Sequence, residues 1–136
     1  AEVVWGEVEE QGTIAFHCVA DDRWVVASIT PEGERRMAEA APDHSDRWRS
    51  LGVSILQTLV LETLLEAHDL PKPGYAHLID EVAESIDSGQ YALTALVMPA
   101  GLPEIEAISA KLERMPPKST YFYPKLLSGL VINPLE

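Results

Sequence analysis

Three short runs near the start of the chain are rich in apolar residues of the β-branched and aromatic types that favour strands. They are Val3–Val8, Thr13–Val19 and Trp24–Ile29, and short polar segments separate them. Short β-prone runs bounded by polar turn residues are typical of strands joined in hairpins. We therefore expect the chain to begin with an antiparallel β-meander.

The apolar spacing then lengthens to three or four residues, as in amphipathic helices. Thr30 followed by Pro31 is typical of a helix start and predicts a short helix leading into Arg35–Ala41. The strongest helical pattern covers Asp46–His68. Its apolar residues gather on one side, which predicts the most buried helix of the domain; they are Leu56, Leu59, Val60, Leu64 and Ala67.

Helix and strand patterns alternate after a proline-containing break at 70–74. They predict a helix at Ala76–Asp87, a strand at Tyr91–Met98 and a helix at Glu104–Arg114, followed by β-prone segments at 120–123 and 130–132. Helices packed on a mixed sheet satisfy this order, so we expect an α+β fold. With 136 residues, 46% of them apolar, we expect residues 1–136 to form a single domain.

Composition argues against several functional classes. No apolar run approaches the roughly 20 residues that span a bilayer, so we expect no membrane association. Cys18 is the only cysteine, which favours a reducing, cytoplasmic location over a disulfide-bonded one. The formal net charge of -12 repels phosphate backbones, and we expect no nucleic-acid binding by this domain alone.

The last 26 residues depart from this acidic character, because four basic residues face only two acidic ones from Lys111 onward. Prolines frame a segment in which two lysines flank four hydroxyl groups. Lysine and hydroxyl side chains can hydrogen-bond phosphate, and we predict an anion-binding patch there. The glycines of a phosphate-binding loop are absent, so side chains would do the binding; they are Lys118, Ser119, Thr120, Tyr121, Tyr123 and Lys125. A proline-framed turn with half-buried tyrosines and solvated lysines is the alternative.

The run from Met115 to Lys125, Met-Pro-Pro-Lys-Ser-Thr-Tyr-Phe-Tyr-Pro-Lys, resembles the carboxy-terminal signature of the bacterial domain-of-unknown-function family number 1015. The stretch Trp48–Glu62 resembles the same family, with Gly52 and Gln57 where relatives often carry aspartate and histidine. Relatives also have an amino-terminal Asp-Gly-His-His-Arg motif in a ParB-like region, and that motif is absent here. The resemblance implies a carboxy-terminal fragment of a longer protein that handles nucleotides or phosphorylated metabolites.

Other polar residues are secondary candidates. Glu62 is a carboxylate in the second family-like stretch, and an exposed helical acid is the alternative reading. His77 and Asp80 are three residues apart on a predicted helix, the spacing that acid–base or metal pairs use. Two ligands do not make a metal site, and we predict none. His17 and Cys18 are adjacent in a predicted strand and therefore point to opposite faces.

From these observations the sequence predicts a cytoplasmic domain that contributes an anion-binding edge to a small-molecule site. The amino-terminal region of the same longer chain would complete that site, and the fragment alone would not be catalytic. The competing hypothesis is a scaffold or dimerisation module, because tyrosine is enriched at interfaces; a homodimer is its simplest form. Residue types do not identify a reaction, a ligand or a cofactor.

Overall fold

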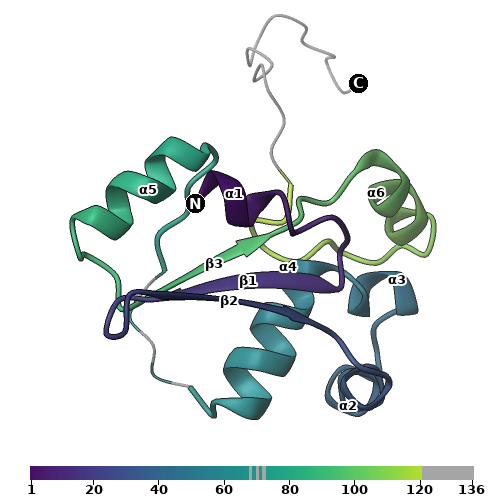
Figure 1. Cartoon of the computed structure of the whole chain (residues 1–136). Helices are drawn as coiled ribbons and strands as arrows, with labels where there is room; N and C mark the ends of the chain where they lie inside the picture. The colour runs from purple at the N-terminus through teal and green to yellow at the C-terminus, as the bar shows by residue number, and fades with distance from the viewer. Residues whose placement is uncertain (68, 70, 72, 121–136) are drawn as a thin grey trace, which may run out of the picture.

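The computed structural model describes residues 1–67, 69, 71 and 73–120 and has an α+β fold (Figure 1). Its described strands are β1 (Thr13–Cys18), β2 (Arg23–Ser28) and β3 (Leu93–Val97). They form one sheet in the order β2-β1-β3, and both pairs are antiparallel. The α+β class expected from the sequence is confirmed, and so are the strands expected near these three positions.

The chain begins with a helical turn, so the strand predicted at Val3–Val8 is wrong. Helix α1 covers Glu2–Trp5, and the Trp5 N–H donates to the Ala1 carbonyl at 2.9 Å. Val4 and Val8 pack toward the sheet, whereas Val3 is exposed. A spacing of four residues fits one face of a helical turn as well as one face of a strand, so the pattern alone does not separate the two.

The larger part of the core lies on one face of the sheet. Helices α2 (Pro31–Ala40), α3 (Asp46–Arg49) and α6 (Leu102–Ser109) cover this face together with the segment 52–64. Buried side chains from these elements, together with Leu51 between α3 and α4, form one core with Ile14 of β1; the others are Met37, Trp48, Ile55, Leu59 and Ile108.

The opposite face carries a smaller cluster. Val8 packs there with Ala15 of β1 and Leu96 of β3, and helix α5 (Ile79–Asp87) covers them through Ile79 and Val82. Figure 1 shows α1 and α5 on this side and α2 and the 52–64 segment on the other. The sheet is therefore a middle layer between two sets of helices.

The helix predicted at Asp46–His68 is divided into three parts. After α3, Leu51 adopts an extended conformation with ψ 135° and inserts its side chain into the core. Helix α4 (Gly52–Ser54) then continues into η1 (Ile55–Leu64), a π-helix. A π-helix forms hydrogen bonds from residue i to residue i+5, so its turn is wider than that of an α-helix and does not keep the apolar face predicted from α-helical spacing. Leu59 is buried, but Leu64 is 53% exposed.

The sequence predicts the start of α2 more accurately than the end of α6. The Thr30 hydroxyl accepts a hydrogen bond from the Gly33 N–H at 3.2 Å, as expected for the cap of α2. Helix α6 ends at Ser109 instead of Arg114, because Leu112 has a left-handed φ of 57° that stops the helix. None of the helices within the described ranges combines the length and the apolar character needed to cross a bilayer.

Candidate functional site

The predicted anion patch is only partly within the described residues. Lys118 has a left-handed φ of 62° and an exposed side chain. The next residue, Ser119, is buried, and its hydroxyl donates to the Pro116 carbonyl at 2.7 Å, so this hydroxyl fixes the turn. Thr120 is half-buried. Tyr121, Tyr123 and Lys125 lie outside the described residues.

The turn holds Lys118 beside an aromatic ring from a distant segment. Its Nζ lies 5.9 Å from the centroid of the Tyr75 ring, within the range of a cation–π contact. Tyr75 is itself exposed. The structure therefore adds Tyr75 to the neighbourhood of Lys118, a contact across 43 positions that the sequence pattern does not indicate.

Exposed charge in the segment 110–120 is entirely positive. Lys111, Arg114 and Lys118 are exposed, and none of them forms an ion pair with another described residue. The single acid of the segment, Glu113, turns inward, and its side chain is only 11% exposed. The exposed surface of this segment therefore has a higher net positive charge than the sum of its charged residues.

Glu113 joins the end of α6 to the loop before α3. His44 Nδ1 donates to Glu113 Oε1 at 2.6 Å, and the Ser45 N–H donates to both carboxylate oxygens at 3.1 and 3.3 Å. Burial raises the pKa of Glu113, but hydrogen bonding from Ser45 and His44 outweighs it, so the pKa lies below the ordinary 4.5. Glu113 is therefore a carboxylate at neutral pH.

The His44 ring is fixed on its other side by an aromatic stack. It lies 3.7 Å from the Trp48 ring between centroids, with 10° between the planes. The Ser45 hydroxyl accepts a hydrogen bond from the backbone N–H of Trp48 at 3.3 Å and caps α3. This cap fixes the start of the helix that carries Trp48. The side chain of His44 stays 39% exposed.

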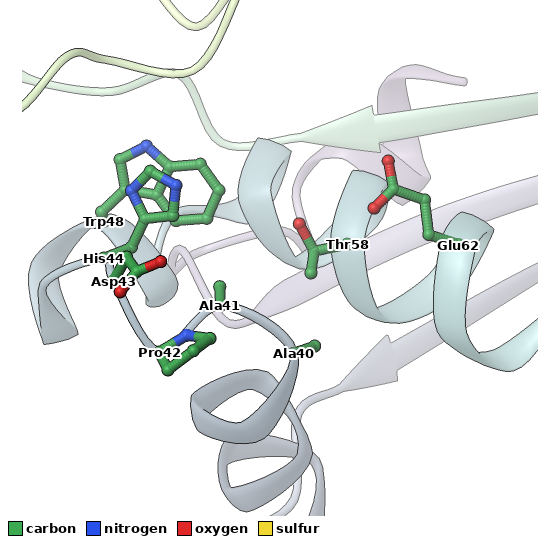
Figure 2. A pocket seen from close by; sticks show the side chains of 8 residues that line it. All are labelled: Ala40, Ala41, Pro42, Asp43, His44, Trp48, Thr58 and Glu62. Atoms are coloured by element: carbon green, nitrogen blue, oxygen red, sulfur yellow. The ribbon is translucent and has the colours of Figure 1, made fainter.

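A hollow of about 290 Å³ opens beside this stack (Figure 2). In Figure 2 His44 and Trp48 lie at one end, Thr58 and Glu62 project from η1 at the other, and residues 40–42 line the side between them. Asp43 lines it as well. A second hollow of about 520 Å³ shares Asp43 and His44 with the first and reaches Lys111.

The secondary candidates have separate positions. Glu62 lines the first hollow and accepts from Gln57 Nε2 at 2.7 Å. His77 precedes α5, which starts at Ile79, so His77 and Asp80 do not share a helix face as predicted. The backbone N–H groups of His77 and Leu78 donate to Glu81 Oε2. The hydrogen bond from His77 has the larger effect and the one from Leu78 the next, and both lower the pKa of Glu81. No cluster of three or more metal-ligating side chains occurs in the part of the chain that the structure describes.

Gly52, for which the resemblance predicts a loss of aspartate, is buried at the start of α4. A Cβ atom built there would lie 3.1 Å from the Gln11 carbonyl oxygen and 3.5 Å from Val97. The Gly52 N–H donates to the Gln11 side chain at 2.9 Å. A carboxylate at this position would have to displace backbone, which fits the absence of one here.

His17 and Cys18 point to opposite sides of β1, as expected. His17 is buried, and its Nε2 pairs with Asp22 at 3.1 Å beside the Trp24 ring. The Cys18 thiol donates to Asp21 at 3.7 Å. Trp48 belongs to the larger core cluster, and Trp24 packs against the smaller one. Trp5 is exposed.

Comparison of the chain with protein-family models, with curated proteins and with solved structures finds no match. The resemblance to family number 1015 accordingly stays a prediction.

Proposed function

We propose that this chain contributes an anion-binding edge to a small-molecule site that a further region of a longer protein completes. The observation that carries the proposal is the charge of the segment 110–120, where every exposed charged side chain is a cation and the acid is turned inward. The chain as a whole has a net charge of -12, so this cationic segment is the part of the described surface that favours an anionic ligand.

Lys118 is the central residue of the proposal. Its turn is held by Ser119 and Pro116, so little backbone freedom is lost when a ligand binds. A lysine ammonium is a compact charge that suits phosphate oxygens, and a phosphorylated small molecule or nucleotide is the ligand class that it fits. Tyr75, beside Lys118, offers an aromatic face for a base or other planar group.

The proposal is tested by titrating the chain with inorganic pyrophosphate and with ATP and following backbone amide signals by NMR. We expect dissociation constants in the millimolar range, on the order of -4 kcal/mol, because few cations act on the ligand. Lys118→Gln should weaken binding about ten-fold, since one charge-assisted hydrogen bond contributes roughly 1.5–3 kcal/mol. Arg47→Gln is the matched control, because Arg47 is also exposed but belongs to α3.

Equal losses in the Lys118 and Arg47 variants would mean that only overall charge attracts the anions, and the edge would not exist. Duplex DNA serves as a third probe. We expect no salt-sensitive DNA binding, because the net charge of -12 repels a polyanion that extends beyond the small cationic segment. Strong DNA binding would contradict the restriction to small ligands.

A second candidate function is dimerisation through the edge of the sheet. Strand β2 is exposed on nearly all of its length, and Val25 and Val26 are 54% and 43% exposed on opposite faces. Among the described residues, no strand pairs with the outer edge of β2. Apart from Arg23 at its start, β2 carries no charged residue and no proline, and an edge strand of this kind is a template for pairing with another strand. A second copy of β2 is the partner that we propose for it.

A further inference from the structure

The imidazole of His44 is held more firmly than a surface histidine needs to be. The Glu113 carboxylate holds Nδ1, and the Trp48 ring fixes the plane of the imidazole. The Arg49 guanidinium also donates to the carbonyl oxygens of Ala41 and His44, which ties the loop on both sides of Pro42 and Asp43. Position, tilt and hydrogen bonding of the ring are thus set by residues of α3 and by Glu113.

The contact to Glu113 determines which nitrogen faces a ligand. Because Nδ1 donates to the carboxylate, Nε2 is the nitrogen that carries the free lone pair. The side chain is 39% exposed and borders both hollows, so small molecules can reach the ring. A carboxylate that orients an imidazole in this way also stabilises the imidazolium that forms when Nε2 takes up a proton.

We propose that His44 is a general acid–base group that exchanges a proton with a small protic molecule bound in the hollow of Figure 2. In the forward step the ligand's O–H or N–H bond breaks, and Nε2 takes the proton while Glu113 remains the carboxylate partner. In the reverse step the imidazolium returns that proton to the ligand or to water. The exchange is a proton transfer alone and needs no oxidant or reductant.

The walls of the hollow define the class of ligand. Asp43 and Glu62 are carboxylates, Thr58 adds a hydroxyl, and none of the described residues that line this hollow is a lysine or arginine. Anions are therefore disfavoured, and a neutral or positively charged molecule is preferred. This selectivity is opposite to that of the Lys118 edge, so the two sites take different molecules.

The π-helix supplies the wall that faces His44. Thr58 and Glu62 both come from η1. Hydrogen bonds from residue i to residue i+5 are rare in proteins and occur frequently at functional sites. A volume of about 290 Å³ is at the lower end of the range for small-molecule pockets, which fits a ligand of few atoms.

The hydrolysis of p-nitrophenyl acetate, a small neutral ester, tests this proposal in the intact chain. In the general-base route Nε2 takes a proton from water as the water oxygen attacks the acyl carbon, and the bond to p-nitrophenolate then breaks. Direct attack by Nε2 would instead leave an acetyl group on His44, which mass spectrometry detects, and that result would overturn the proton-transfer role. We expect the chain to exceed free imidazole at equal concentration. His44→Gln should lower kcat/KM at least about ten-fold, the weak end of general acid–base catalysis because the ester is not a natural substrate.

Glu113→Gln separates proton transfer from a structural role. The amide oxygen can still accept from Ser45, but the negative charge is lost. We expect kcat to fall several-fold with KM unchanged, because the lost interaction acts on the charge that forms in the transition state. Glu106→Gln, on the exposed side of α6, is the matched control and should retain the wild-type rate.

A purely structural pair gives a different result. In that case His44→Gln and Glu113→Gln lower the melting temperature but leave the hydrolysis rate equal to that of Glu106→Gln, and the proposal is wrong. If His44→Gln does not fold by circular dichroism, the rate of Glu113→Gln decides alone. A wild-type chain no faster than free imidazole also overturns the proposal.

Discussion

At the scale of single residues, Glu113 combines several contacts. Its carboxylate accepts from His44 and from Ser45, and it joins the end of α6 to the loop before α3. The same contacts remove the only acid of the 110–120 segment from the surface. One side chain thus fixes a loop, orients an imidazole and leaves a cationic surface behind.

The hydrogen bonds to Glu113 make the stability of the fold depend on pH. The pKa of Glu113 is lower in the folded chain than the ordinary 4.5, so the folded state binds the proton less well than the unfolded state. Its contribution to stability is complete above about pH 4.5 and is lost as the pH falls through the folded pKa. Urea unfolding across this window should show a steeper fall for the wild type than for Glu113→Gln.

Glu106→Gln is the control for this pH experiment, because it removes an exposed carboxylate from the neighbouring helix. We expect its unfolding free energy to follow the wild-type curve through the acid range. If Glu113→Gln and the wild type lose stability in parallel, the carboxylate contributes nothing to folding, and its role in orienting His44 is also in doubt.

At the scale of elements, the π-helix η1 shows where burial is concentrated within the 52–64 segment. Leu59 is buried at 5% exposure and packs in the main cluster, whereas Leu64 at the end of the same helix is 53% exposed. Leu59→Ala should therefore lower the free energy of unfolding by about 2–5 kcal/mol. Leu64→Ala removes the same atoms and should cost less than about 1 kcal/mol.

Denaturant unfolding of the two leucine variants measures this difference. Equal losses would mean that the two positions are equally buried in solution and that the register of η1 differs from the one described here. A difference near 2 kcal/mol or more supports the register of η1, with Leu59 buried and Leu64 exposed.

Elements with local signals could be predicted from the sequence. Strands β1 and β2 follow from their apolar, β-branched and aromatic residues, and α2 follows from Thr30 and Pro31. The break at Leu51 could not, because its extended backbone is set by packing in the core and leaves no mark in the apolar spacing. The start of the chain is ambiguous because Val4 and Val8 are four residues apart, a spacing that fits one face of a helix and one face of a strand.

The candidate sites depend on contacts between distant positions, which no single sequence reveals. His44 and Glu113 are 69 residues apart, and neither belongs to a motif that indicates a pair. His44 and Trp48 are four apart, yet the first precedes the cap of α3, so helical spacing does not predict their stack. Lys118 was identified from local composition alone, and its neighbour Tyr75 was not.

At the scale of the whole molecule, the two candidate functions respond to salt in opposite directions. Anion binding at Lys118 is an attraction between opposite charges, so added salt should weaken it. Pairing of two copies through β2 brings together chains of net charge -12, and added salt should strengthen it by screening their repulsion.

Sedimentation of the chain at rising concentration tests pairing through β2. We expect a dimer that becomes stronger with salt, and Val25→Lys should weaken it at least ten-fold, about 1.4 kcal/mol, because a charge at an edge strand disfavours pairing. Val3→Lys, which places the same charge on the exposed face of α1, is the control and should dimerise like the wild type. A chain that stays monomeric at high salt and high concentration, or a Val3 variant as impaired as the Val25 one, excludes the edge of β2 as an interface and leaves the Lys118 edge as the remaining candidate function.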